Sequence, residues 1–240
     1  MVSMVCFAIV AHTIDDLRVF EDKMSTSNRS TSKRSNRESS CNIFTHFPDV
    51  VNDRIDTKTF LNASRGVVKL IEKFGKLFAP VKYDMQGNIE KVNAGYLLDK
   101  EINSTLQDMI LLEVAVGDRN IATNALLWLT RDLHMIHSFF EKIVQDCQAE
   151  KGTEDLVAIL KKSYEESLEP YHGWMAKQLF GLLSRMVPSR SYVLQILANE
   201  ITPREDAIVQ VMSDFTRSLR TNVETLHCFY EEYGLENNRS

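Results

Sequence analysis

The chain has 240 residues, of which 44% are hydrophobic, and a formal net charge of −5 at pH 7. This composition is ordinary for a globular protein with an ample core, and the negative charge gives no general attraction to nucleic acid. No apolar run reaches the roughly 18 residues that a membrane-spanning helix requires. The sequence therefore predicts a globular protein that binds no nucleic acid.

Residues 1–50 have the composition of an N-terminal extension. Between residues 25 and 42 the chain is rich in Ser, Thr, Asn and Arg, so burial of apolar groups cannot offset the entropy lost on ordering. The apolar first ten residues are few, carry no basic residues before them and show no clear cleavage site, which disfavours a signal peptide. We expect residues 1–50 to be largely disordered and residues 51–240 to form the folded domain.

Four cysteines lie far apart in the chain and form no C-x-x-C pair: Cys6, Cys41, Cys147 and Cys228. This spacing fits reduced thiols better than a framework of disulfides. It therefore predicts a cytoplasmic protein.

From residue 56 onward, apolar side chains recur at helical spacing, and no alternation typical of strands interrupts them. Asp56 should cap the first helix, Pro80 should end it, and a second helix should begin near Asp84. Thr202, followed by Pro and later Glu, has the pattern of another helix start. The class is all-α. Further helices are expected at about 102–116, 120–148, 154–168, 171–186, 190–198 and 202–233.

A polar stripe begins the candidate binding site. Asp84, Asn88 and Lys91 are spaced i, i+4 and i+7, so their side chains lie within about 60° of one another on one helical face. A carboxylate accepts hydrogen bonds, an ammonium group donates them and an amide does both, a set that suits a cluster of hydroxyl groups. Alone, such a stripe is more often a solvated helix face.

Aromatic side chains on two other helices extend this candidate site. Trp128 lies in an apolar helix, where it could belong to the core or stack its flat face on a sugar ring. Arg131, one turn later, could pair with an acid or face solvent. His172 could be structural or donate an N–H to a carbonyl, and Trp174 could be packed or exposed at a membrane interface.

The order and spacing of these segments resemble the glycolipid transfer protein family. The resemblance lies in Phe78-x-Pro-Val-x-x-Asp84-x-x-Gly-Asn-Ile-x-Lys91, Leu127-Trp-Leu-x-Arg-x-Leu133 and Tyr171-His-Gly-Trp174, and it extends over residues 55–235. It implies an all-α, two-layer sandwich of about eight helices without disulfides. Such a fold would enclose a hydrophobic tunnel for ceramide chains beneath a surface recognition site.

The resemblance also implies roles for five residues at the head group. Asp84, Asn88 and Lys91 would bind sugar hydroxyls, and Asp84 would also accept the amide N–H of ceramide. Trp128 would stack under the first sugar, and His172 would donate to the amide carbonyl. These five residues form the expected head-group site.

Three further positions match the family's contacts with apolar surroundings. Leu168 and Phe180 correspond to residues that line the tunnel, and Trp174 corresponds to the indole that docks on the membrane. The resemblance thus implies a lipid carrier that makes transient peripheral contact with membranes.

Head-group choice within the family turns on the positions of Asn88 and Trp128. The branch that carries ceramide-1-phosphate has cationic side chains there, notably Arg in place of Trp. A guanidinium can grip a phosphate with two hydrogen bonds, whereas an indole cannot neutralise it. The resemblance therefore favours glucosyl- or galactosylceramide over ceramide-1-phosphate. Thr130, Asp132 and Asn124 depart from the family's pattern, and Asp132 adds an acid near the site.

Other classes of function receive less support from the sequence. An enzyme built on His172 and Asp84 would lack a G-x-S-x-G elbow and a nearby nucleophile. His134 and His137 could share a metal, but no carboxylate motif accompanies them. A lipid sensor would need the same pocket as a carrier. We expect a monomeric, non-enzymatic glycosphingolipid carrier that uses no cofactor or metal.

Overall fold

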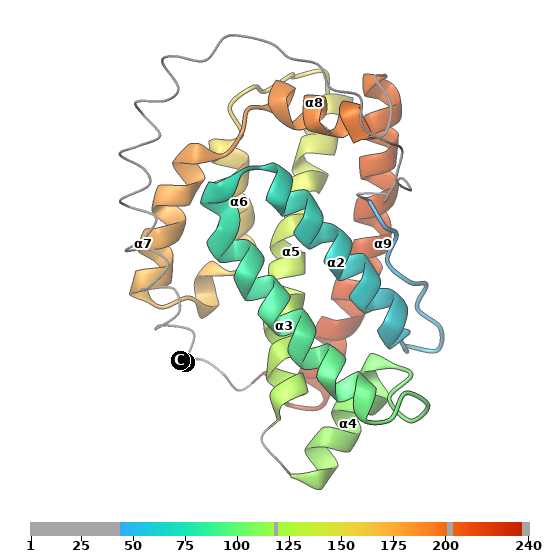
Figure 1. Ribbon diagram of the computed structural model, residues 1–240. Coiled ribbons are helices and arrows are strands. Elements are labelled where there is room, and N and C mark those ends of the chain that lie inside the picture. Colours follow the sequence, from blue (N-terminus) through green and yellow to red (C-terminus); the bar gives the residue numbers. More distant parts are fainter. Residues whose placement is uncertain (1–43, 118–119, 201–203, 237–240) are drawn as a thin grey trace, which may run out of the picture. The chain divides into compact units, whose positions relative to one another are not determined.

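The computed structural model describes residues 44–117, 120–200 and 204–236 (Figure 1). These residues form α-helices and short 3-10 turns, and they contain no named strand. The helices are α2 (Thr57–Lys73), α3 (Ala79–Leu98), α4 (Leu106–Val116), α5 (Ile121–Gln148), α6 (Val157–Ser167), α7 (Trp174–Leu183), α8 (Arg190–Glu200) and α9 (Glu205–Glu232). The predicted all-α class of about eight helices is confirmed.

The helices pack in two layers around the long helix α5. Helices α2 and α3 pack against each other, and α3 lies across α5 (Figure 1). On its other sides α5 contacts α6 and α9, while α8 packs on α9. None of the described helices is both long and apolar enough to cross a bilayer.

Most predicted helix boundaries agree with the structure because their capping residues act locally. The Asp56 carboxylate accepts the backbone N–H of Thr59 at 2.7 Å and caps α2. Gly117 ends α4 with φ of 73°, a left-handed conformation that glycine adopts without strain.

Two predicted boundaries need correction. Helix α3 begins at Ala79 rather than near Asp84, because Pro80 lies in its first turn, where its missing N–H breaks no hydrogen bond. Helix α2 has already ended at Lys73. Helix α9 begins at Glu205 after Arg204, and the predicted cap Thr202 lies outside the described residues.

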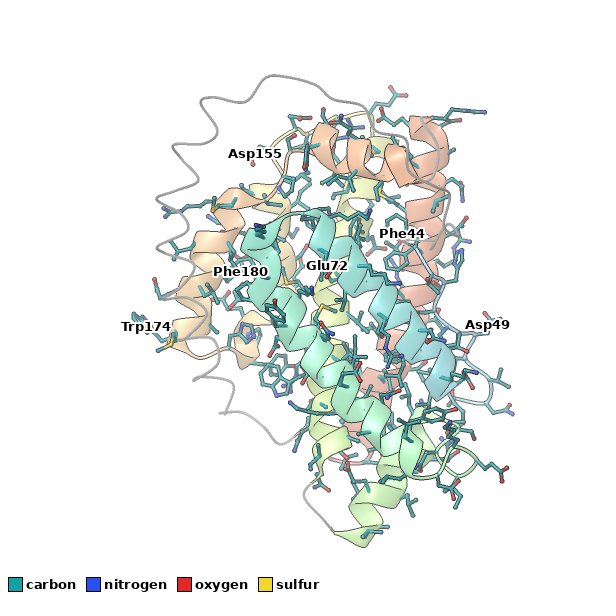
Figure 2. All side chains as sticks on the ribbon, in the orientation of Figure 1. Phe44, Asp49, Glu72, Asp155, Trp174 and Phe180 are labelled. Carbon is teal, nitrogen blue, oxygen red and sulfur yellow. The ribbon has the colours of Figure 1, made fainter. Side chains whose placement is uncertain are left out.

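The folded domain extends at least to Phe44, seven residues before Val51, where the sequence predicts it to begin. Phe44 packs on Phe140 and Phe215, with ring centroids 5.8 and 4.7 Å away (Figure 2). Phe47 packs on Phe60. Two aromatic residues in a polar stretch give no periodic signal, which is why composition alone assigned them to the extension. The expectation of disorder for residues 1–43 concerns a part outside the described residues.

A glycine permits the close approach of α3 to α5. A Cβ atom added at Gly95 would lie 3.1 Å from the Cβ of Ala122 and 3.2 Å from the sulfur of Met109. The two helices can therefore cross tightly beyond the polar stripe of α3. Among the described cysteines, Cys147 and Cys228 are free thiols, as expected.

Candidate functional site

Three segments distant in sequence meet on one side of α5. The stripe of Asp84, Asn88 and Lys91 lies on α3, which packs across α5. Trp128 lies on α5, and its ring stacks on that of His172 with centroids 5.9 Å apart and planes inclined by 25°. The structure thus brings Trp128 together with His172, and it places Asp84 within electrostatic range of Asp132 on α5.

The α3 stripe presents charges around a buried amide. Asn88 is buried, whereas Asp84 and Lys91 reach the surface. Surrounding protein nevertheless raises the pKa of the Asp84 carboxyl, and the nearby Lys91 ammonium opposes this shift. The stripe can therefore accept hydrogen bonds at one end and donate them at the other.

Arg131 is the most deeply buried charge of the site, with a residue exposure of 1%. Its guanidinium carbon lies 3.6 Å from the ring centroid of Tyr171 and 4.9 Å from that of Trp128. All three of its nitrogen atoms are buried without a hydrogen-bond partner among the described residues. Burial lowers the pKa of Arg131, and the electrostatic fields of neighbours such as Tyr171 oppose the shift. The guanidinium therefore presents hydrogen-bond donors that no acceptor among the described residues satisfies.

Asp132 adds a second acid close to Asp84. Burial, reinforced by the charge of Asp84, raises the pKa of Asp132 well above its ordinary value, and Arg131 opposes the shift. Its Oδ2 atom is buried and has no hydrogen-bond partner in the described part of the chain. The site therefore contains two interacting carboxyl groups on facing helices.

A tyrosine orients the imidazole of His172. The Tyr164 hydroxyl lies 3.0 Å from His172 Nδ1. Burial raises the pKa of Tyr164 to about 12, so its hydroxyl keeps its proton and can donate. Burial, with the charges of Lys177 and Arg131, lowers the pKa of His172 and favours the neutral ring. When Tyr164 donates to Nδ1, the ring's own proton lies on Nε2, where it is a donor for a ligand.

Apolar side chains continue from this imidazole into the helical layers. Tyr164 stacks on Phe180 with planes inclined by 9°. Leu168 is buried, and Phe180 is half-buried against the core. Trp174, at the start of α7, is 74% exposed and projects away from the other helices (Figure 2). The indole is therefore exposed rather than packed in the core.

The histidine pair considered as a metal site has other neighbours. His137 accepts a hydrogen bond from the Arg220 Nε atom at 3.3 Å, and burial lowers the pKa of His137 to about 4. His134 packs edge-on to His227. Within the described residues, no three His, Cys, Asp or Glu side chains are arranged to hold a metal.

Sequence reasoning missed part of this site. Tyr164 carries no motif and lies on α6, whereas His172 lies in the loop before α7, so no helical spacing rule connects the two side chains. The sequence marks Asp132 only as an unusual acid near the site. It does not decide whether Arg131 forms an ion pair or faces solvent. A buried arginine that packs on aromatic rings depends on tertiary packing, which one helical pattern does not reveal.

Comparisons with known proteins agree with this arrangement. Residues 55–199 match the glycolipid transfer protein (GLTP) family. The chain is 34% identical over 191 residues to pleckstrin homology domain-containing family A member 8 of Homo sapiens, a match that covers 76% of this chain and 36% of that protein. The chain thus spans about a third of the length of that relative.

Solved structures share the fold. A structure of FAPP2, described as selecting simple glycosphingolipids using the GLTP fold, matches with a TM-score of 0.71 and 29% identity over 82% of this chain and 94% of that one. Human ceramide-1-phosphate transfer protein in complex with that lipid matches with a TM-score of 0.67 and 17% identity, covering 79% and 93%. At this lower identity the likeness shows the fold alone.

The orientation of His172 can be tested by removing one hydroxyl group. In Tyr164→Phe, the imidazole should lose its preference for the Nε2–H tautomer, and the free energy of unfolding should fall by about 1 kcal/mol, as for one hydrogen bond. The ring nitrogen chemical shifts of His172 report the tautomer directly. Tyr192→Phe on the exposed face of α8 is the control. Unchanged ring shifts in Tyr164→Phe would show that Tyr164 does not set the tautomer.

Proposed function

The chain belongs to the glycolipid transfer protein family, and on that basis we propose that it carries glucosyl- or galactosylceramide between membranes. The lipid is moved without chemical change. The sugar is held at the site on α3 and α5, and the two ceramide chains enter a hydrophobic tunnel among the helices. Leu168 and Phe180 are proposed to line this tunnel.

The observation that carries this proposal is that Trp128 lies near both hydrogen-bond donors and hydrogen-bond acceptors. Its half-buried indole lies next to His172, and Asn88 and Asp84 lie on the facing helix. An indole face suits the apolar face of a sugar, while carboxylate, amide and ammonium groups match hydroxyls that donate and accept. The Asp84 carboxylate disfavours an anionic head group at the same place.

A free-energy argument assigns selectivity to the polar end of the lipid. A ceramide chain gains about 0.8 kcal/mol per methylene group on leaving water, but a bilayer already provides this gain. Transfer of the chains from membrane to tunnel is therefore close to neutral. A hydrogen bond to a charged group contributes roughly 1.5–3 kcal/mol. We therefore propose that Asp84, Lys91 and the other residues of the head-group site determine which head group is bound. The tunnel is proposed to accept ceramide chains of different lengths.

The alternative ligand is ceramide-1-phosphate, and it is favoured by one observation. Arg131 and Lys91 are cations at the site, and the guanidinium has donors without partners in the described residues. The Asp84 carboxylate weighs against phosphate. A sensor that retains its glycolipid would use the same residues and would differ in slow release to acceptor vesicles.

The protein is proposed to act as a monomer in the cytosol and to contact membranes transiently. Trp174 is the proposed docking group, because an exposed indole at a helix start prefers the interface between water and lipid. The adjacent Met175 is also exposed and would enlarge the apolar contact.

Transfer by an Asp84 variant tests the proposed function. Asp84→Asn keeps the size of the side chain and removes its charge, so movement of fluorescent glucosylceramide between vesicles should slow by about tenfold or more, as for one charge-assisted hydrogen bond. Glu90→Gln on the same helix removes an exposed carboxylate that pairs with Arg65 at 3.6 Å, and it should transfer like wild type. Wild-type rates in a folded Asp84→Asn protein would contradict the proposed site.

Membrane docking is tested separately from head-group choice. Trp174→Ala should weaken partitioning to phosphatidylcholine vesicles by about tenfold, because burial of an indole in the interface is lost. The preference among head groups should not change. Leu98→Ala removes another highly exposed apolar side chain, at the far end of α3, and serves as the control. Equal partitioning of Trp174→Ala and wild type would show that α7 does not dock through this indole.

A further inference from the structure

The guanidinium of Arg131 has aromatic contacts on its flat faces, but its N–H groups have no hydrogen-bond acceptors among the described residues. The ring of Tyr171 covers the guanidinium at 3.6 Å, and Trp128 lies 4.9 Å away. Stacking on π systems uses the flat faces of this group, whereas its N–H bonds point outward in its plane. All three nitrogens lack a hydrogen-bond partner in the described part of the molecule. The buried donors therefore require acceptors in the plane of the group.

Neighbouring acids offset the charge of Arg131 without satisfying these donors. Glu236 and Asp132 both interact electrostatically with the guanidinium, yet neither forms a hydrogen bond to it within the described residues. A buried cation whose charge is offset while its donors stay free suits a neutral oxygen acceptor better than a second anion.

We propose that Arg131 is a lipid-binding residue whose in-plane N–H groups donate hydrogen bonds to oxygen atoms of the sphingolipid head group. This inference rests on the proposed function and adds a contact that the motif-based site lacks. Sugar hydroxyls and phosphate share the required acceptor chemistry, and the Asp84 carboxylate favours the sugar.

The test is a competition in which ceramide, which has no head group beyond its hydroxyl, is the reference. The full chain is incubated with phosphatidylcholine vesicles that contain equal amounts of glucosylceramide, ceramide-1-phosphate and ceramide. The protein is separated from the vesicles, and its bound lipids are measured by mass spectrometry. Wild type is compared with Arg131→Met, Arg131→Lys and the control Arg217→Met, which changes an exposed arginine on α9. Circular dichroism and thermal unfolding confirm that each variant is folded.

Arg131→Met should lower the ratio of bound glucosylceramide to bound ceramide by about tenfold, as expected for loss of a hydrogen bond from a charged donor. Uptake of ceramide itself should not fall. Arg131→Lys keeps the charge but loses the planar fork, so its ratio should lie between those of Arg131→Met and wild type. Arg217→Met should match wild type.

Other outcomes separate this inference from the proposed function. If wild type prefers ceramide-1-phosphate and Arg131→Met loses that preference, the proposed glycolipid specificity is wrong and the role of Arg131 stands. An unchanged ratio in Arg131→Met, or in Arg131→Lys if only that variant folds, would make Arg131 a structural residue and overturn the inference. A wild type that takes up none of the three lipids contradicts both proposals.

Discussion

The packing of α3 across α5 is the contact on which the whole candidate site depends. Asp84 lies on α3, whereas Trp128, Arg131 and Asp132 lie on α5, so the electrostatic interaction between Asp84 and Asp132 exists only because of this crossing. The crossing is so close that a Cβ atom added at Gly95 would lie 3.1 Å from the Cβ of Ala122, a tighter contact than most Cβ atoms make. A rigid pair of helices can hold hydrogen-bonding groups more accurately than loops can.

This arrangement places costly groups at the site rather than in the general core. Burial of an unpaired guanidinium and of a carboxyl group opposes folding, and stability alone would favour apolar residues of similar size. Arg131 and Asp132 nevertheless lie together beside Trp128. Tyr164, in contrast, reduces the freedom of His172 by one hydrogen bond and leaves Nε2 available. Both features fit a site whose polar groups are completed by a ligand.

The parts of the fold that depend on local chemistry could be predicted from the sequence. Asp56 marks the start of α2 by capping it, and Gly117 marks the end of α4 by its left-handed conformation. The periodicity of residues 120–148 predicts the bounds of α5 almost to the residue. The start of α3 was misplaced because Pro80 is compatible with either ending a helix or opening one.

The candidate site was only partly predictable, because only those of its features that depend on local spacing can be read from the sequence. Asp84, Asn88 and Lys91 share a helical face by spacing alone, and the family resemblance connected them with Trp128 and His172. The contacts of Arg131 with Tyr171 and of Tyr164 with His172 join residues on different elements. Such contacts are set by how helices pack, and neither hydrophobic period nor capping rules determine that packing. The burial of Phe44 could not be predicted either, since the rings on which it packs lie on α5 and α9.

Photo-crosslinking with glucosylceramide that carries a diazirine on its sugar would test most directly whether these segments form one head-group site. If they do, adducts on the wild-type full chain should fall within residues 84–91 of α3, 128–132 of α5 and 171–174 before and at the start of α7. A separate hollow lies between α5 and α9 and is lined by residues that include Glu141, Gln145, Arg217 and Arg220. Adducts confined to that hollow would contradict the central claim.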